Sequence, residues 1–240
     1  QGEFQGAAGL FRQAVRVLGA GRREKRWRAE AYMMLGGIAL ATNRLDKAKP
    51  LLQQAMDVFQ DLGLVRGMAQ AGNLIADLAR KQGRTDEAIE WYTKAVDRFG
   101  HLGGSHSGLA RINLALAYID AANYKEARRV LEICTSFFSQ NGQKQWEATS
   151  RCLILPPLAQ DNLWKEFDSQ LKIAERLLRE TMFRQADLAN ALSLAGQICL
   201  DLGRRERAQN VCQLSLQMYE DMKDAKGAER LRKFLDQFAP

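Results

Sequence analysis

The residues of this chain that could carry out covalent chemistry are few. Its two histidines, His101 and His106, lie with serines in the stretch GHLGGSHSG (100–108). A serine beside a histidine can form a nucleophile and its base, provided that a third group orients the histidine. The stretch holds no acidic residue, and a glycine-rich loop positions such a pair poorly. We therefore expect that the protein is not an enzyme.

The spacing of the cysteines and glycines argues against a bound metal or cofactor. Four cysteines are widely separated, without a CxxC pair: Cys134, Cys152, Cys199 and Cys212. Such spacing matches neither zinc ligands nor a disulfide framework, so we expect reduced thiols in a cytoplasmic protein. The glycines of residues 100–108 follow no predicted strand and precede no GK[ST] motif, so they do not predict a phosphate-binding loop. We expect no metal and no cofactor.

Positive charge is concentrated near the start of the chain. The net charge is +7, and residues 1–28 hold seven of the 35 Arg and Lys residues but only two of the 28 acidic ones. Most of this charge lies in GRREKRWR (21–28), as Arg22, Arg23, Lys25, Arg26 and Arg28. Such a segment could bind the phosphates of a nucleic acid while Trp27 stacks on a base. It could instead be a solvated turn between helices, or a surface that meets an acidic neighbouring domain.

A pattern of small and large residues, typical of α-helices, repeats along the chain. The stretch GRTDEAIEWYTKAVDRF (83–99) shares its spacing of small and large residues with five others. The sixth position of each stretch recurs every 39 to 41 residues, as Ala7, Ala48, Ala88, Ala127, Phe167 and Ala208. A mostly large, apolar residue follows four positions later, and a mostly small one three positions after that. This i, i+4, i+7 pattern predicts the buried face of an α-helix.

Another predicted helix precedes four of these stretches and also carries a small residue at a matching place. These small residues are Gly36, Ala76, Ala115 and Gly196. Helices that pack about 8–10 Å apart leave no room for bulky side chains where they cross. We expect Gly36 to face Ala48 and Gly196 to face Ala208. Side-chain size is therefore what the repeat retains, while residue identity varies.

Turn residues recur at the ends of the predicted helices. Within the helix pairs they are Asn43, Gly83 and Gly203, and between pairs they are Gly63, Gly103 and Gly142. Glycine and asparagine adopt the left-handed backbone conformation that commonly ends a helix. The positions therefore predict short, tight turns between antiparallel helices.

This small–large–small spacing over a helix–turn–helix unit resembles the tetratricopeptide repeat. The period of about 40 residues, against about 34 in the common form, is similar to the extended variety in kinesin light chains, LGN-type polarity adaptors and MalT-like regulators. The resemblance covers nearly the whole chain, roughly residues 5–222. It implies an all-α fold, an α-α superhelix in which antiparallel helix pairs stack into a right-handed solenoid.

The repeat divides the chain into units. We expect a half repeat at 5–22, full repeats near 29–68, 69–107, 108–147, 148–188 and 189–224, and a capping helix within 225–240. Residues 1–4 (QGEF) have the character of a tag or cloning remnant.

The fourth full repeat departs from the pattern, because it contains Pro156-Pro157 in the middle of its first helix. A proline inside a helix lacks a backbone donor and costs about 3 kcal/mol or more. We expect this helix to be kinked or broken between Glu147 and Gln160. Two interpretations of this break are equally open. It is either a functional bend in the superhelix or the result of sequence drift in a repeat that tolerates it.

In tetratricopeptide folds the first helix of each pair lines a concave groove. By position, the resemblance assigns to this groove Met33, Gln70, Asn73, Asp77, Arg80, Asn113, Leu116, Asn190 and Gln197. An asparagine amide offers a donor and an acceptor to an extended peptide backbone. Each such bond contributes only about 0.5–1.5 kcal/mol net, so several repeats must act together.

The resemblance implies a non-enzymatic scaffold or adaptor. Its groove would bind a peptide segment, or another domain of a larger regulatory or signalling protein. One alternative is an effector-sensing domain that binds a small molecule or peptide signal, and a second is nucleic-acid binding through residues 21–28. The half repeat could also mediate homodimer formation. No stretch approaches 18 uninterrupted apolar residues, so we expect no membrane partner.

Overall fold

The structure of the protein is a computed structural model that describes residues 2–19, 21–100 and 105–236. Its chain divides into two compact units, residues 1–117 and 118–240. Helix α6 (Ser105–Asp120) runs across the boundary between them. The described residues contain no β-strand, which confirms the predicted all-α fold class.

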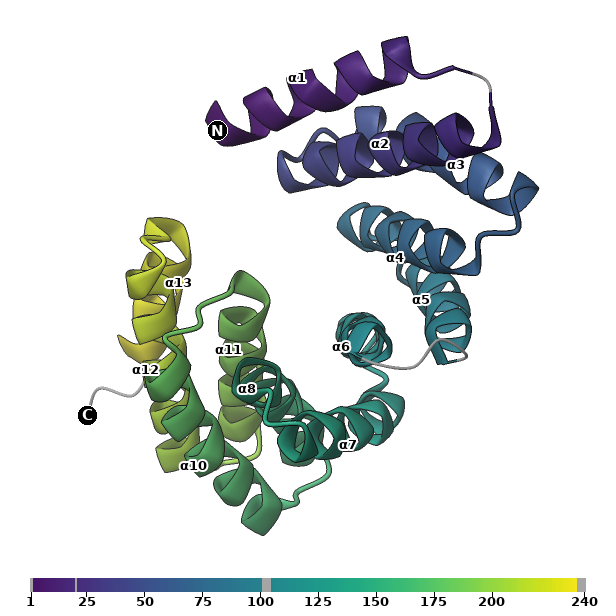
Figure 1. Ribbon diagram of the computed structural model, residues 1–240. Helices are drawn as coiled ribbons and strands as arrows, with labels where there is room; N and C mark the ends of the chain where they lie inside the picture. The colour runs from purple at the N-terminus through teal and green to yellow at the C-terminus, as the bar shows by residue number, and fades with distance from the viewer. Residues whose placement is uncertain (1, 20, 101–104, 237–240) are drawn as a thin grey trace. The chain divides into compact units, whose positions relative to one another are not determined.

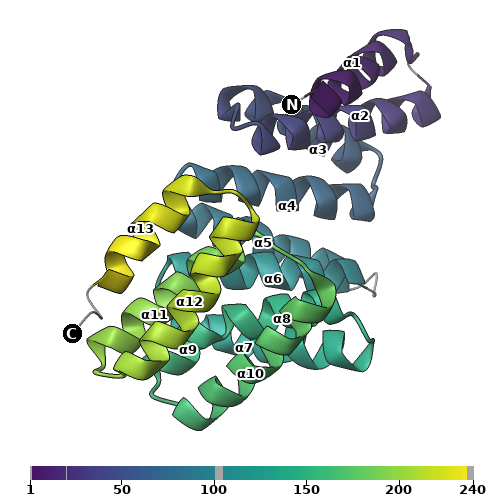
Figure 2. The ribbon, with the colours of Figure 1, turned by 90° about the vertical axis from the view of Figure 1, so that its left-hand side faces the viewer.

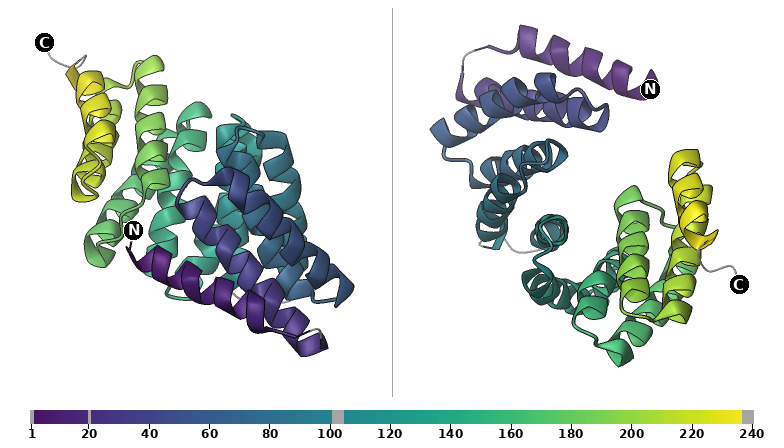
Figure 3. Two further views of the ribbon diagram at one scale, coloured as in Figure 1. Left: turned by 90° about the horizontal axis from the view of Figure 1, so that it is seen from above. Right: turned by 180° about the vertical axis from the view of Figure 1, so that it is seen from behind.

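The first unit is built from successive helices that pack side by side (Figure 1). They are α1 (Gly2–Val17), α2 (Arg22–Ala41), α3 (Leu45–Asp61), α4 (Val65–Lys81), α5 (Thr85–Gly100) and the first part of α6. Helix α1 packs against α2 (Figure 3). Short turns reverse the chain between α2 and α3 and between α4 and α5, so these form antiparallel pairs.

The second unit is likewise built from successive packed helices. Its helices are α7 (Tyr124–Gln140), α8 (Lys144–Leu153), α9 (Leu155–Gln160), α10 (Trp164–Thr181), α11 (Ala186–Asp201), α12 (Arg205–Asp221) and α13 (Ala225–Leu235). Helices α11, α12 and α13 pack in sequence (Figure 2). The limits of the individual repeats stay a prediction.

The recurring small positions lie in the core of their helix pairs. Ala48 and Ala88 in the first unit, and Ala127 and Ala208 in the second, are completely buried. Phe167, which takes the place of alanine in the fourth full repeat, is completely buried as well. The size pattern therefore marks the core face of these five helices, as predicted, whereas Ala7 of α1 is only half-buried.

The side chains nearest to the crossing glycines lie one helical turn beyond the expected alanines. A Cβ atom on Gly36 would lie 2.5 Å from Cδ2 of Leu52, and one on Gly196 would collide with Sγ of Cys212. The atoms nearest to Gly36 therefore belong to Leu52, and its facing with Ala48 stays a prediction, while Gly196 approaches the carbonyl oxygen of Ala208 as well as Cys212. The reason is that the large side chain one turn beyond the alanine fills the space that the glycine leaves open.

The predicted turns have the left-handed backbone that their residue types suggested. Asn43 has φ 54° and Gly83 has φ 73°, and the turn residues Gly63, Gly142 and Gly203 also have positive φ. The turn at Asn43 is closed by a hydrogen bond from the N–H of Arg44 to the carbonyl of Ala39 at 2.7 Å, as in a Schellman motif. Gly103 lies outside the described residues. The pattern did not identify Ala122, which takes the same conformation with φ 53°.

The proline pair breaks its helix, as predicted. Helix α8 ends at Leu153, and after the interruption at Ile154 the short helix α9 begins at Leu155, with Pro156 and Pro157 in its first turn. The first turn of a helix tolerates proline because its N–H groups have no partner inside the helix.

The segment 21–28 is helical, so its interpretation as a turn between helices is wrong. Helix α2 begins at Arg22, after the extended N-cap residue Gly21. Arg, Lys and Glu are good helix formers, so the helix extends through these charged residues back to Arg22. The five basic residues therefore occupy the first turns of α2.

Candidate functional site

A hollow in the first unit brings together four of the residues assigned to the groove. Helices α2, α4, α5 and α6 line an open hollow of ≈ 260 Å³, which we name the amide hollow. Its predicted members are Met33, Gln70, Asn73 and Asn113. The apolar side chains of Leu74, Phe99 and Leu109 complete much of its wall, and His106 lies at its edge.

The two asparagines of this hollow are hydrogen-bonded to each other. Nδ2 of Asn113 donates to Oδ1 of Asn73 at 3.2 Å, across a separation of one repeat, 40 residues. Both side chains are half-buried. No intramolecular partner occurs among the described residues for Nδ2 of Asn73 or for Oδ1 of Asn113. One donor and one acceptor therefore stay available to a ligand in the same hollow.

The apolar part of the amide hollow is suited to a large side chain. Met33 is buried at its base, whereas Met34 exposes 45% of its surface beside it. The imidazole of His106 stacks on Phe99, with ring centroids 5.8 Å apart. Methionine side chains are flexible and polarizable, so they adapt to ligands of different shapes.

The histidine–serine arrangement does not form in the described part of the loop. Ser107 is buried, and its hydroxyl accepts a hydrogen bond from Arg111. His106 makes its contact with the ring of Phe99. His101 lies outside the described residues. Nothing described here forms a nucleophile and its base.

Three other residues assigned to the groove lie apart from this hollow. The carboxylate of Asp77 accepts a hydrogen bond from the hydroxyl of the buried Tyr92, which ties α4 to α5. Leu116 is buried in the core. Arg80 lies near the end of α4 and does not line the hollow.

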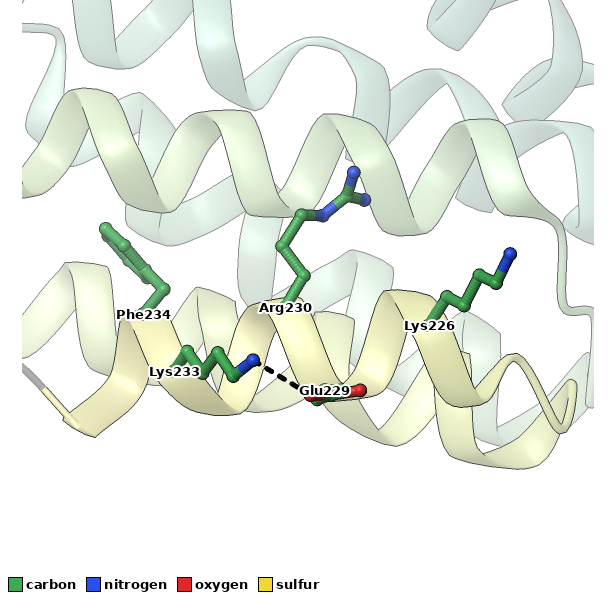
Figure 4. Close-up of a pocket in the computed structure, with 5 residues that line it drawn as sticks. All are labelled: Lys226, Glu229, Arg230, Lys233 and Phe234. Carbon is green, nitrogen blue, oxygen red and sulfur yellow. Dashed lines mark ion pairs between the residues drawn. The ribbon is translucent and has the colours of Figure 1, made fainter.

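The second unit has its own hollow between α11 and α13, with a volume of ≈ 330 Å³. It contains the predicted residues Asn190 and Gln197, together with Arg230 and Phe234 of α13. Arg230 and Phe234 also line an adjoining space of ≈ 460 Å³ on α13, with Lys226 (Figure 4). We name the surface formed by Asn190, Gln197, Lys226, Arg230 and Phe234 the cationic hollow.

The α13 side of the cationic hollow is absent from the predicted groove, because the sequence predicts only a capping helix at residues 225–240. The period offered a signal, since Arg230 follows Asn190 by one repeat of 40 residues. Asn190 is held in place by Tyr219, whose hydroxyl donates to Oδ1 of Asn190 at 2.6 Å. Nη2 of Arg230 donates to the same hydroxyl at 3.3 Å. Burial raises the pKa of Tyr219, and the nearby Arg230 lowers it in part.

Two segments of the chain, residues 29–61 and residues 67–138, match sequence profiles of the tetratricopeptide repeat. These two segments are tetratricopeptide repeats. Comparison with curated protein sequences gives no significant match.

Solved structures with low sequence identity share the fold of this tetratricopeptide-repeat (TPR) protein. BtubC (BKLC) from P. vanneervenii has a TM-score of 0.68 at 16% identity, with 99% of this chain and 92% of that chain covered. A putative kinesin light chain from Podospora anserina, with TPR-like repeats, has a TM-score of 0.60 at 17% identity, covering 75% of this chain and 89% of that one. YrrB, a TPR protein with an unusual peptide-binding site, has a TM-score of 0.53 at 16% identity, with 85% of this chain and 92% of that chain covered.

Three of the five basic residues at the start of α2 contact other groups of the protein, and the structure gives no such contact for Lys25 or Arg28 among the residues that it describes. Arg26 pairs with Glu30 at 2.9 Å, and Arg22 donates to the carbonyl of Leu62 at 3.4 Å. The guanidinium of Arg23 lies over the ring of Trp27, 4.5 Å from its centroid. One face of this indole is therefore already covered, which weakens the case for base stacking.

The TPR core holds all four cysteines as free, buried thiols. Burial raises the pKa of Cys152, Cys199 and Cys212 to about 12. A thiol with such a pKa stays protonated near neutral pH, and only the thiolate is a good nucleophile or metal ligand. Among the residues that the structure describes, no three His, Cys, Asp or Glu side chains form a metal-binding group, and no helix is long and apolar enough to cross a membrane.

Proposed function

We propose that this TPR protein is a non-enzymatic scaffold that binds an extended segment of another protein in the amide hollow. The observation that carries the proposal is the pairing of Asn73 with Asn113 beside an apolar space. The free Nδ2 of Asn73 can donate to a backbone carbonyl, and the free Oδ1 of Asn113 can accept from a backbone N–H. An apolar side chain of the same segment would enter the hollow against Met33, Leu74 and Phe99.

The likeness to YrrB supports this proposal, since that protein has the same fold and a peptide-binding site. The segment could belong to a separate protein or to a neighbouring domain of a larger regulatory protein. We further propose that the protein acts in the cytoplasm, where buried cysteine thiols stay reduced.

A displayed library of random linear peptides tests the proposal. Peptides selected on the wild type should share a large apolar residue, and each should bind the variant Asn73→Ala/Asn113→Ala roughly tenfold or more weakly, because two backbone hydrogen bonds are lost. The matched control is Gln54→Ala/Gln60→Ala, which removes two exposed amides of α3 that line neither hollow.

Two outcomes would contradict the proposal. One is the absence of any peptide enriched over an unrelated helical protein. The other is equal affinity of the selected peptides for the Asn73→Ala/Asn113→Ala variant, with circular dichroism confirming that both proteins are folded.

A further inference from the structure

Helix α13 presents two cations without an acidic partner. Lys233 pairs with Glu229 at 2.8 Å, and Arg232 pairs with Glu220 of α12. Over the described residues, no carboxylate lies within ion-pairing distance of Lys226 or Arg230. Both of these side chains are exposed and line the cationic hollow.

The guanidinium of Arg230 is positioned by neutral groups. Its Nη2 atom lies 3.3 Å from the hydroxyl of Tyr219 and 3.5 Å from Oδ1 of Asn190. Tyr219 is buried and is itself bonded to Asn190, so the two acceptors form a fixed pair. Neither acceptor neutralises the charge, and Nε and Nη1 stay available for a ligand. A guanidinium held this way can bind both oxygens of one carboxylate.

The remaining side chains of this surface suit a peptide. Lys226, Arg230 and Phe234 are spaced four residues apart, which places them along one face of α13. Figure 4 shows them extending to the same side of the helix, while Lys233 and Glu229 bond to each other. Across the hollow, α11 contributes the polar Ser193 and Gln197 beside Leu194.

We infer that the cationic hollow binds an aspartate or glutamate side chain of a linear peptide, next to an apolar residue that contacts Phe234. Arg230 would bind the carboxylate through two hydrogen bonds, and Lys226 would add a second positive charge. Gln197 and Ser193 would bind the peptide backbone. This inference rests on the proposed peptide-binding function and adds the chemistry of a second contact in the other unit.

Charge complementarity favours a peptide over a nucleic acid. A nucleic acid is held by many phosphate contacts along a basic track. The cationic hollow has two unpaired cations beside apolar Phe234 and Leu194, and Glu229 lies at its edge. One carboxylate with an apolar neighbour matches this set more closely than a chain of phosphates does.

The test selects random linear peptides on the full chain, in parallel on the wild type, on Arg230→Gln and on Arg232→Gln. The last variant is the matched control, since it removes the same charge from the same helix at a residue already paired with Glu220. Peptides selected on the wild type and on Arg232→Gln should be enriched in Asp or Glu beside an apolar residue, and the enrichment should disappear on Arg230→Gln. A selected peptide should bind roughly tenfold more weakly after its acid is changed to the amide, or to Arg230→Gln, and more weakly as salt rises.

Several results would overturn the inference. One is equal affinity of the protein for the acidic peptide and for its amide form. Another is an equal loss of peptide affinity in Arg230→Gln and Arg232→Gln. A third is displacement of the bound peptide by a single-stranded oligonucleotide at the same concentration as the peptide. Enrichment of apolar peptides that depend on Asn73 and Asn113 but lack acidic residues would overturn this inference alone. The absence of any enriched peptide would overturn the proposed function with it.

Discussion

The side chain of Leu52 occupies the space next to Gly36 that a β-carbon would need. A Cβ atom there would lie 2.5 Å from Cδ2 and 2.7 Å from Cγ of Leu52. Gly36 lies on the first helix of its pair and Leu52 on the second, so the contact sets how closely α2 and α3 approach. The second unit repeats the relationship between Gly196 and Cys212.

This contact predicts that Gly36→Ala destabilises the protein even though alanine favours helix. Overpacking costs about 1–3 kcal/mol, and the helix propensity of alanine returns about 1 kcal/mol. We expect a net loss of roughly 1 kcal/mol in the free energy of unfolding, measured by urea denaturation. In a Leu52→Ala background the same substitution should cost nothing, because the colliding atoms are gone. An equal cost in both backgrounds would show that the two residues do not determine the crossing.

The buried thiol of Cys152 predicts a loss of stability at alkaline pH. Burial raises its pKa from 9.0 to about 12, and Glu175 adds to the rise. The folded protein therefore retains a proton that the unfolded chain releases above pH 9, so the stabilisation is complete below pH 9 and is lost as the pH rises toward 12. Urea denaturation below and above pH 9 should show a shallower decline for Cys152→Ala than for the wild type. Identical declines would exclude this thiol as a contributor.

The ion pair between Glu147 and Arg151 predicts a large effect of a single substitution. Oε1 of Glu147 accepts from Nη2 of Arg151 at 2.7 Å, both side chains are only 11–12% exposed, and Gln170 accepts from the same guanidinium. Removing one partner leaves a charge without compensation in a largely buried place, so Glu147→Gln should reduce the free energy of unfolding by about 3 kcal/mol. The double variant Glu147→Leu/Arg151→Met should be less damaging than Glu147→Gln. A thermal denaturation series in which the double variant is the least stable would contradict this account.

The hydroxyl of Tyr219 predicts a specific effect on the cationic hollow. Tyr219→Phe removes the group that bonds to Asn190 and to Arg230, so the guanidinium should lose part of its fixed position. We expect the affinity for a selected acidic peptide to fall several-fold, and stability to fall by about 1 kcal/mol. Tyr92→Phe is the matched control, because it removes the buried tyrosine hydroxyl that bonds to Asp77 in the first unit. It should lower stability to a similar extent but leave the affinity for the acidic peptide unchanged.

Much of the fold could be predicted because small and large side chains recur at a regular spacing along the sequence. Ala48, Ala88, Ala127 and Ala208 are buried as the period indicated. The broken helix at Pro156-Pro157 was predictable as well, because proline acts on its own backbone and on the turn before it. The start of α2 was misplaced, since the charged residues 22–28 give no apolar period although they are good helix formers.

The candidate site was predictable only in part. The register of the repeat assigned Asn73, Asn113 and Asn190 to the groove, and the structure adds that Asn73 and Asn113 are bonded to each other. It also assigned Leu116 and Asp77 to the groove, although the first is buried and the second is bonded to Tyr92. A position carried over from a repeat pattern fixes the side of a helix only approximately, so it does not say whether a side chain reaches the solvent.

The sequence by itself determined the all-α repeat, the short turns and the set of small residues at the helix crossings. These features follow from local preferences and from side-chain size at a regular spacing. Only the tertiary structure decided that Leu52, rather than Ala48, fills the space at Gly36, and that Arg230 of α13 completes a hollow with Asn190 of α11. Such contacts depend on the rotation of each helix about its axis and on the reach of long side chains, and a linear spacing records neither.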